Sequence, residues 1–330
     1  MPAKASARVC RGAGGRSARA TAWLRDRRMR VDDIHQVFIV GAGTMGQQIA
    51  LQCATHGLGA IVYDLSRDAL DKASENISDY GARLVREARL TPDHLEAAWR
   101  RISFSSRLDD AATADLVSES VPEDPKLKAE VFARLNDICP PRTVFTTNTS
   151  TLVPSLFSEA TGRPAQFAAL HFHQYVWDAN LVDIMPHPGT AQETIELLRA
   201  FARRIGQVPL VFRKESPKYV VNAMLGAIND VALRLVADGV ASVEDVDRAW
   251  MIVMKTAVGP FGSLDVVGLD TVWHIIQANS AAAARAECDP RAKLIKDYVD
   301  KGWLGVKSGR GFYTYPDPAY ARPDFLRGEA

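Results

Sequence analysis

The stretch VFIVGAGTMGQQIALQCATHG, with IVYD shortly after it, limits the possible folds more than any other part of the chain. The apolar run at residues 37–40 indicates a buried strand, and the segment beyond the following turn has the composition of a helix. Between them lie Gly41, Gly43 and Gly46 in the pattern G-x-G-x-x-G. In such a turn Gly41 permits the tight bend, Gly43 lets the backbone approach a pyrophosphate, and Gly46 allows close helix–strand packing. The helix N-terminus then offers free N–H groups and a positive dipole end to the phosphates.

A second apolar run, at residues 60–63, ends in Asp64, about 20 residues beyond the glycines. A carboxylate at that place accepts hydrogen bonds from the adenosine ribose hydroxyls and repels the additional phosphate of NADP. Glycine-rich turns also occur for purely structural reasons, but strand, glycines, helix, strand and acid in this order are much more specific. The sequence therefore predicts a dinucleotide-binding site with NAD as the cofactor.

The composition is that of an ordinary globular protein. The chain has 330 residues, 47% of them hydrophobic and 24% charged, so it is long enough for two domains with large cores. Its four cysteines form no C-x-x-C pair, which argues against a disulfide framework and is typical of a reducing compartment. We therefore expect a cytoplasmic location. No apolar run approaches the ~18 residues of a membrane span, so we expect no membrane contact, and nothing indicates a nucleic acid partner.

The first 28 residues differ from the rest because they carry Lys4 and seven arginines against one acid, Asp26. Three interpretations apply: a transit peptide, a basic arm that binds polyanions, or a segment upstream of a true start at Met29. We favour the last, with residues 1–28 disordered or not translated, because the sequence from Met29 leads into the first strand by a normal short approach. The remainder of the chain is then mildly acidic.

From the glycine turn to about residue 213 the pattern alternates between strands and helices, and after Pro217 it is helical until the strand-like run FYTY at 312–315. The alternation predicts an α/β fold, a Rossmann-type doubly wound, mainly parallel sheet with helices on both faces. We expect this NAD-binding domain over residues 29–215 and a helical C-terminal domain over residues 216–330. The expected strands are 37–40, 60–63, 116–118, 143–147, 167–172, 181–185 and 210–212, and the expected helices are 66–85, 125–137, 155–159, 191–205, 219–238, 243–254, 271–287 and 292–301.

A histidine and a carboxylate follow one another on two neighbouring strand-like runs. His171 lies at the carboxyl end of the first run, where ligands bind in a doubly wound sheet, and Asp183 lies on the second. A dehydrogenase needs a base for the hydroxyl proton, and a carboxylate behind a histidine fixes its tautomer. From spacing alone, a histidine at a strand end is more often a polar residue of the sheet rim. His171 and His173 also form an H-x-H pair, but no third ligand stands at a supporting spacing, so we expect no metal site.

Further motifs, in the correct order, resemble the L-3-hydroxyacyl-CoA dehydrogenase family, to which the 3-hydroxybutyryl-CoA dehydrogenases belong. The resemblance runs from about residue 35 to residue 315, nearly the whole chain apart from the basic leader. Besides the glycine turn it rests on ESVPEDPKLK, NTSTL, ALHF, LVDIM with HPGT, SPKYVVNAML, GPFGSLDVVGLDT and KSGRGFYTY. L-Gulonate and carnitine dehydrogenases resemble the same family, so the resemblance implies the fold more strongly than the substrate.

The resemblance also implies roles for individual residues of the reaction site. His171 matches the family's catalytic histidine, and Asp183 stands where the family usually has a glutamate that orients it. Ser150 matches a serine that contacts the substrate near its reacting oxygens. Asn222 matches an asparagine on the first long helix of the second domain, which completes the site.

On the cofactor side, the resemblance adds Glu123 and Lys128 to the three glycines and Asp64. In the family the helical domain also supplies the dimer interface. A homodimer is therefore the expected assembly of this chain.

The chain departs from the family pattern in the same site. The family commonly reads H-F-F-N-P where this chain has HFHQY at residues 171–175. Gln174 keeps the amide of the usual asparagine on a longer arm, and Asp183 is one methylene shorter than glutamate. These changes imply either compensating shifts of the strands or altered catalysis.

The sequence thus predicts an NAD-dependent dehydrogenase of fatty acid metabolism that oxidises an (S)-3-hydroxyacyl thioester, a short-chain acyl-CoA, to the 3-oxoacyl thioester. His171 acts as the general base and Asp183 orients it. Substrate contacts are expected from Ser150, Gln174 and Asn222. Two alternatives stay open. One is a dehydrogenase of the same fold acting on a free hydroxy acid, gulonate- or carnitine-like, and the other is a non-catalytic dinucleotide-binding protein.

Overall fold

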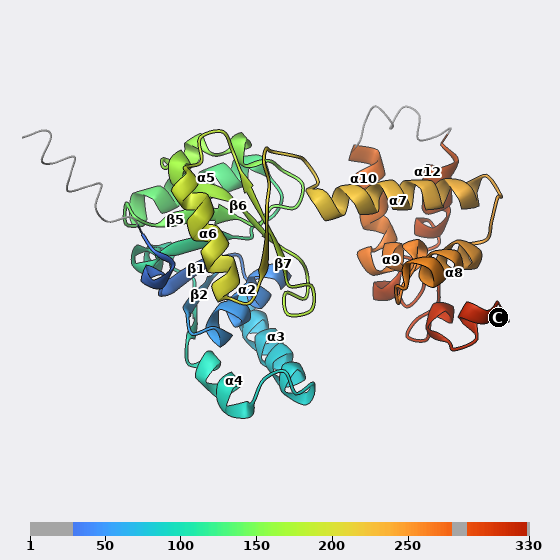
Figure 1. Cartoon of the computed structure of the whole chain (residues 1–330), viewed down its shortest axis with the longest axis horizontal. Helices are drawn as coiled ribbons and strands as arrows, with labels where there is room; N and C mark the ends of the chain where they lie inside the picture. Colours follow the sequence, from blue (N-terminus) through green and yellow to red (C-terminus); the bar gives the residue numbers. More distant parts are fainter. Residues whose placement is uncertain (1–28, 279–288, 329–330) are drawn as a thin grey trace, which may run out of the picture. The chain divides into compact units, whose positions relative to one another are not determined.

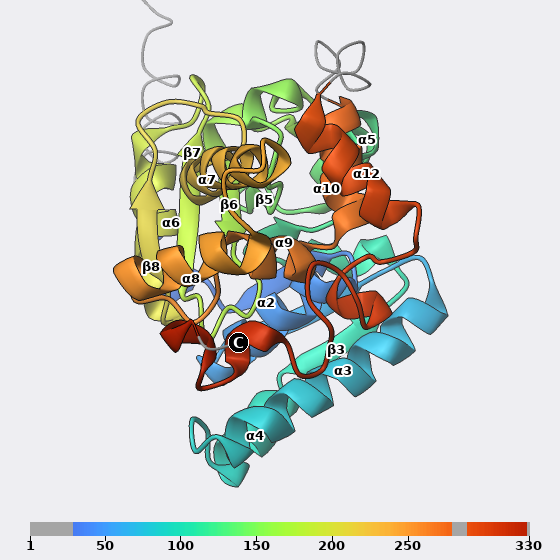
Figure 2. The same cartoon turned by 90° about the vertical axis from the view of Figure 1, so that its right-hand side faces the viewer.

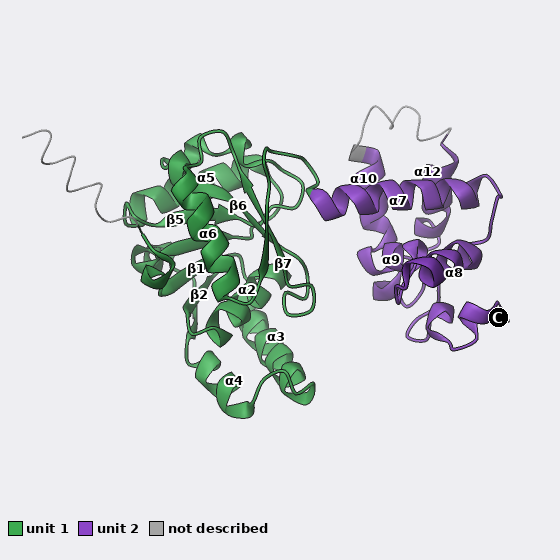
Figure 3. Ribbon diagram, in the orientation of Figure 1, with its two compact units in different colours: residues 1–219 green, residues 220–330 purple. Residues whose placement is uncertain are grey.

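An eight-stranded sheet forms the centre of the first of two units into which the chain divides. The computed structural model describes residues 29–278 and 289–328, so the basic leader 1–28 lies outside the described residues. The first unit ends at Tyr219 and the second begins at Val220 (Figure 3). The boundary expected between residues 215 and 216 lies a few residues earlier.

The strands follow the order β3-β2-β1-β4-β5-β6-β7-β8 (Figure 1). All neighbouring strands are parallel except β6 and β7, which pair antiparallel. The order reverses at β1, and a doubly wound sheet binds its ligand outside the carboxyl ends of the strands at such a point. The expected fold class is confirmed. The strands are β1 (Gln36–Val40), β2 (Gly59–Tyr63), β3 (Ile102–Ser105), β4 (Leu116–Glu119), β5 (Val144–Thr147), β6 (Phe167–Phe172), β7 (Leu181–Pro186) and β8 (Val208–Val211).

Helices cover both faces of the sheet, because the central strands are apolar on each face. One hydrophobic cluster joins α2, α3 and α6 to the sheet, and a second cluster on the opposite face contains α5. Figure 2 shows α4 beside α3. Ser66 caps the start of α3 and Asp124 caps the start of α5, each by accepting a backbone N–H. The helices are α2 (Thr44–Thr55), α3 (Arg67–Arg86), α4 (Pro92–Trp99), α5 (Pro125–Ile138) and α6 (Gln192–Arg204).

Several local expectations for the first unit are wrong. The strand β3 and the helix α4 both form, although neither was expected from the apolar pattern. The helix expected at residues 155–159 is instead two short 3₁₀ turns, Pro154–Leu156 and Glu159–Thr161. Prolines and exposed polar residues in these segments weaken the periodicity on which such predictions depend.

The second unit is built from helices around its own hydrophobic core, whose largest fully buried side chains include Phe261 and Phe325. Both views show α12 beside α7 and α10 (Figures 1 and 2). The expected helical character is confirmed, although the end of the helix expected at 271–287 lies outside the described residues. The helices are α7 (Val220–Ala237), α8 (Val243–Met254), α9 (Pro260–Val267), α10 (Leu269–Ala278) and α12 (Pro290–Val299).

Two buried carboxylates hold the C-terminal motifs of this unit together. Asp247 accepts the N–H groups of Phe261 and Gly262 at 2.8 and 2.9 Å and the Tyr313 hydroxyl at 2.9 Å. Asp265 accepts two N–H groups of the FYTY run, both at 2.9 Å. The expectation of a strand at FYTY is therefore wrong, because two of its backbone donors are satisfied by a side chain and only Thr314 forms an isolated bridge, with Arg310.

The expectation that no apolar segment approaches the length of a membrane span is wrong for helix α7. Its 18 residues are long and apolar enough to cross a membrane, and only 11% of that segment is buried. It also carries charge, since Asp230 pairs with Arg234 and with Arg291 of α12. Charges in the middle of a membrane span are costly, and Ala232 and Leu233 pack into the core of the unit. The helix thus has one core-facing side and a second, exposed apolar side.

Candidate active site

The glycine turn has the backbone geometry that a pyrophosphate requires. Gly41 has a φ of +109°, and a Cβ atom there would lie 2.6 Å from the carbonyl oxygen of Ser120. A Cβ atom on Gly46 would lie 2.0 Å from the carbonyl oxygen of Gly41, so α2 approaches the turn this closely only without a side chain. At Gly43, by contrast, no neighbouring group of the described chain lies within 4 Å of the Cβ position. The space at the N-terminus of α2 is therefore open to a ligand.

Asp64 follows β2 and closes the turn from the opposite side. One of its oxygens accepts the N–H of Ala42 and the other accepts the N–H of Ser66, both at 3.0 Å. The carboxylate and Gly43 line a cavity of about 750 Å³. Cofactor pockets span roughly 300–1,000 Å³. The open turn, the helix N-terminus and the fixed carboxylate therefore fit NAD.

Lys128, which the family resemblance assigns to the cofactor, is buried with its side chain 1% exposed. Its ammonium lies 2.7 Å from Glu119 Oε1 and 3.3 Å from Glu123 Oε2, and it donates to the carbonyl of Val121 at 3.1 Å. Burial raises the pKa of Glu119 despite the attraction of this ammonium. Lys128 thus ties the end of β4 to α5, and its contact with NAD stays a prediction.

Glu123 organises the loop that carries Ser150. Its Oε1 accepts the N–H groups of Ser150 and Thr151, both at 3.0 Å, and the hydroxyls of Thr149 and Thr151. Burial alone would raise the pKa of Glu123, but the hydrogen bond from Thr149 and the charge of Lys128 outweigh it and lower that pKa. An ionised carboxylate therefore fixes the backbone of this loop. In this arrangement Glu123 acts through Ser150, and its own contact with NAD stays a prediction.

Asn148 joins the same loop to the strand that carries His171. Its side-chain oxygen accepts the N–H of Phe172 at 2.8 Å, and its own N–H donates to the carbonyl of Glu119 at 2.7 Å. Because Phe172 directly follows His171, Ser150 and His171 lie at the same edge of the sheet. Sequence reasoning missed this role of Asn148, although the residue stands at the head of the NTSTL motif.

His171 and Asp183 face one another across β6 and β7. They are partners in the antiparallel register, and His171 Nδ1 lies 2.9 Å from Asp183 Oδ2. Both are buried, with 6% and 0% of their surface exposed. Burial alone would raise the pKa of Asp183, but hydrogen bonds from His171 and His173 lower it below its usual value. When the imidazole of His171 is neutral and donates its Nδ1–H to Asp183, its Nε2 carries no hydrogen.

A second imidazole binds the same carboxylate oxygen. His173 Nε2 lies 3.2 Å from Asp183 Oδ2, and the two imidazole ring centres are 4.8 Å apart. The nitrogen and oxygen atoms of His171, His173 and Asp183 that could bind a metal all lie within 4.8 Å of one another. The premise that no third ligand accompanies the H-x-H pair is therefore wrong, because β7 supplies one. Spacing along the chain did not reveal it, since the ligand comes from the neighbouring strand.

Two more side chains support the histidines. The ring of Tyr219, the last residue of the first unit, lies 4.7 Å from that of His171, and burial raises the pKa of its hydroxyl. From α2, Gln48 accepts the N–H groups of Tyr175 and Val176 at 2.6 and 3.3 Å. Tyr175 has a φ of +60°, a conformation that a bulky residue rarely adopts. The buried side-chain amide of Gln48 therefore fixes the backbone conformation of the segment after His173.

The expected substrate contacts are divided between the two units. Ser150 is half-buried and Gln174 is exposed, both in the first unit, whereas Asn222 lies half-buried on α7 of the second unit. The contacts of these three residues with a substrate stay predictions.

The fold and the glycine turn define a nicotinamide-dependent oxidoreductase. Residues 36–216 match the NAD binding domain of 3-hydroxyacyl-CoA dehydrogenase, and residues 219–315 match its C-terminal domain. The chain therefore belongs to the 3-hydroxyacyl-CoA dehydrogenase family, as expected from its motifs. It is an NAD-dependent oxidoreductase, and a purely non-catalytic role is set aside.

Individual relatives agree with this assignment. The chain is 32% identical to the 3-hydroxybutyryl-CoA dehydrogenase of Bradyrhizobium diazoefficiens, over 86% of this chain and 96% of the relative. The solved structure of (S)-3-hydroxybutyryl-CoA dehydrogenase from Ralstonia eutropha superposes with a TM-score of 0.77 at 31% identity, covering 86% of this chain and all of that one. A diketoreductase described as acting on dicarbonyl compounds superposes with a TM-score of 0.78 at 36% identity, over 86% and 99% of the two chains.

Alanine substitutions at Gly43 and Gly46 are expected to affect different properties, NAD binding in the first case and stability in the second. Gly43→Ala should leave the melting temperature nearly unchanged, because its Cβ meets open space, but weaken NAD binding about tenfold or more by occupying the phosphate position. Gly46→Ala should lower the free energy of unfolding by about 1–3 kcal/mol, because its Cβ overlaps the turn. Thermal unfolding and titration of NADH fluorescence measure both effects. Unchanged NAD affinity in Gly43→Ala would contradict the assigned phosphate site.

Proposed function

We propose that this protein oxidises an (S)-3-hydroxyacyl thioester, a short-chain acyl-CoA, to the 3-oxoacyl thioester with NAD, as part of fatty acid metabolism. The observation that carries the proposal is the pair formed by His171 and Asp183 at the sheet edge, which leaves His171 Nε2 free to accept a proton. The names of the relatives support the acyl-CoA class of substrate. The chemistry of the pair is that of alcohol oxidation, which needs a proton acceptor beside the reacting carbon.

The chain's own groups account for the proton transfer. His171 Nε2 takes the proton of the C3 hydroxyl, and the ring becomes an imidazolium. Asp183, ionised and buried, stabilises this cation and keeps the ring in place through Nδ1–H. NAD, when bound, accepts the hydride that leaves C3. The glycine turn and Asp64 hold the cofactor, and Glu123 keeps the loop of Ser150 ordered for contact with the substrate oxygens.

A substrate without CoA is the second candidate. The diketoreductase, at 36% identity, supports a dicarbonyl substrate without CoA, and a free hydroxy acid of gulonate or carnitine type is the related alternative that the family resemblance leaves open. In addition, the four basic side chains of α3 are balanced by four acidic ones, so the helix offers no net positive charge to a CoA phosphate. Gln174 and Tyr175 also replace the residues that the family commonly has after its histidine.

A substrate panel decides between the two candidates. With NAD in excess, kcat/KM for (S)-3-hydroxybutyryl-CoA should exceed that for free (S)-3-hydroxybutyrate by about 100-fold or more, because remote binding energy of the CoA moiety lowers the barrier. NADH formation at fixed pH measures the oxidation of the thioester, gulonate and carnitine, and NADH consumption measures the reduction of a dicarbonyl compound. Faster turnover of gulonate, carnitine or the dicarbonyl compound than of the thioester would favour the second candidate.

His171→Ala should lower kcat by about 10²–10⁴-fold, the usual contribution of a general base, with NAD affinity within twofold of the wild type. Asp183→Asn should reduce kcat by a comparable factor, because an amide stabilises neither the tautomer nor the imidazolium. His35→Ala, an exposed histidine ahead of β1, serves as the matched control and should keep full activity. Turnover of His171→Ala within threefold of the wild type would reject the assigned base.

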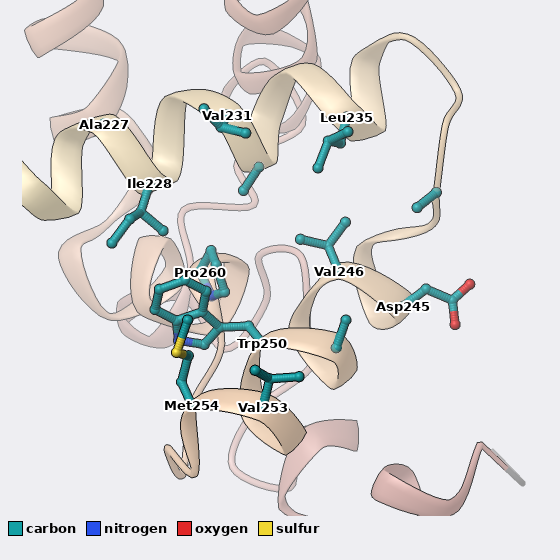
Figure 4. Close-up of a pocket in the computed structure, with 13 residues that line it drawn as sticks. Ala227, Ile228, Val231, Leu235, Asp245, Val246, Trp250, Val253, Met254 and Pro260 are labelled. Atoms are coloured by element: carbon teal, nitrogen blue, oxygen red, sulfur yellow. The ribbon is translucent and has the colours of Figure 1, made fainter.

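We further propose that the protein is a homodimer through its second unit, as the family resemblance implies. An apolar groove of about 650 Å³ lies between α7 and α8 (Figure 4). It is lined by Val231 and Leu235 of α7 and by Val253 and Met254 of α8, and Val253 is 71% exposed. An apolar surface of this kind is typical of a protein–protein interface. A second copy of the same groove is its proposed partner.

The mass in solution tests this assembly. Light scattering after gel filtration should give twice the chain mass of 36.1 kDa for the wild type and a single chain mass for Val253→Glu. Val208→Glu, at an equally apolar but separate site that is 55% exposed, should remain dimeric. A monomeric wild type would overturn the proposal. Sedimentation of the wild type, but not of Val253→Glu, with phosphatidylcholine vesicles would also overturn it, because the groove would then bind lipid. The cytoplasmic location remains a prediction that fractionation of the native cell tests.

A further inference from the structure

The proposed oxidation does not use His173. Its Nε2 shares Asp183 Oδ2 with His171, so one buried carboxylate oxygen has an imidazole on each side. The family commonly has phenylalanine at this place, as noted above, and a phenyl ring would make no such contact. The proposed oxidation therefore does not explain the role of the second imidazole.

The three side chains have the spacing of metal ligands. His171 Nδ1 and His173 Nε2 lie 2.9 and 3.2 Å from Asp183 Oδ2. Adjacent ligands of one metal ion, each about 2.0–2.2 Å from it, are separated by about that much. Since all three atoms lie within 4.8 Å of one another, the point equidistant from them is at most about 2.5 Å from each. A shift of a few tenths of an ångström, with a rotation of both rings that turns their lone pairs from Asp183 Oδ2 toward the ion, brings all three atoms to zinc bonding distance.

The chemistry of the ligands also favours a metal of this class. Imidazole binds zinc, copper, nickel and iron well, whereas calcium and magnesium prefer oxygen ligands throughout. Asp183 is fully buried, and its second oxygen, Oδ1, has no hydrogen-bond partner in the described chain. His173 is the most exposed of the three, with 16% of its side chain accessible, and so lies on the route by which an ion enters.

We propose that His171, His173 and Asp183 form a zinc-binding site whose occupancy switches off the dehydrogenase. The metal site itself stands on the geometry of these three residues. Only its inhibitory consequence rests on the proposed function, because it concerns the nitrogen that accepts the substrate proton.

Inhibition follows from the tautomer of His171. In the active state Nδ1 carries the hydrogen and donates it to Asp183, and Nε2 is the free base. Zinc bound at Nδ1 displaces this hydrogen, and the neutral ring then carries one on Nε2 instead. One proton thus leaves Nδ1 and one arrives at Nε2, with no net change in the charge of the ring. His173 exchanges its hydrogen from Nε2 to Nδ1 in the same way. With zinc bound, His171 has no lone pair to offer the substrate.

The test uses the whole chain, freed of metal by dialysis against EDTA and then titrated with zinc chloride. Wild-type turnover should fall more than tenfold at saturating zinc and return when EDTA is added. His173→Phe and His173→Asn should each keep at least half of their own zinc-free activity under the same conditions. His35→Phe is the matched control and should be inhibited like the wild type. Equal inhibition of the wild type and both His173 variants would overturn the proposal.

Binding is measured separately from activity. One zinc ion per chain should remain on the wild type after gel filtration, and cobalt chloride should give a visible ligand-field absorption band. Both signals should be lost in His173→Phe and His173→Asn, whose melting temperatures establish that they fold. Stoichiometric binding that depends on His173 in a protein without activity on any hydroxyacyl substrate would refute the proposed function and leave the zinc site standing. Full activity with no zinc retained would refute the zinc site alone.

Discussion

The candidate reaction site depends on one interaction, the hydrogen bonding of the buried Asp183 carboxylate to two imidazoles. The carboxylate is completely buried, and an isolated charge in that position is unfavourable by several kcal/mol. Two imidazole N–H donors on one oxygen offset this cost and keep the group ionised, so its pKa lies below the usual value. In turn the carboxylate fixes the hydrogen on Nδ1 of His171 and leaves Nε2 basic. The antiparallel pairing of β6 and β7 is what sets the two groups opposite one another.

Glu119, at the end of β4, links the cofactor turn and the loop that carries Ser150 to the sheet. Its buried carboxylate binds Lys128 and Thr147, and its backbone carbonyl binds Asn148. The residue that follows it, Ser120, has its carbonyl oxygen against Gly41 of the cofactor turn. One strand end, that of β4, therefore supports both the turn that fits NAD and the loop that carries Ser150. Substitutions at Glu119 would therefore disturb both the cofactor turn and the Ser150 loop.

Much of the fold was predictable because it depends on patterns of residues that are close together in the chain. The glycines, the apolar strands and the acid after β2 stand close together in the chain, and each restricts the backbone in a known way. The predictions for β3 and FYTY were wrong because both segments depend on partners distant in sequence. The edge strand β3 pairs with β2 alone, and FYTY donates two of its N–H groups to Asp265. The boundary predicted from the charged, proline-containing stretch before α7 lies a few residues ahead of the division between the two units.

The candidate reaction site was also predictable in part, because two of its residues lie on strands that follow one another in the chain. His171 and Asp183 were paired from the succession of two strands, but His173 was not assigned to the carboxylate, since its contact depends on the course of the chain beyond β6. That course is held by Gln48 of α2, which is distant in sequence from the segment that it binds. The amide thus acts on the histidines indirectly. By fixing the backbone just after His173, Gln48 keeps the second imidazole beside Asp183, in the arrangement on which the proposed metal site depends.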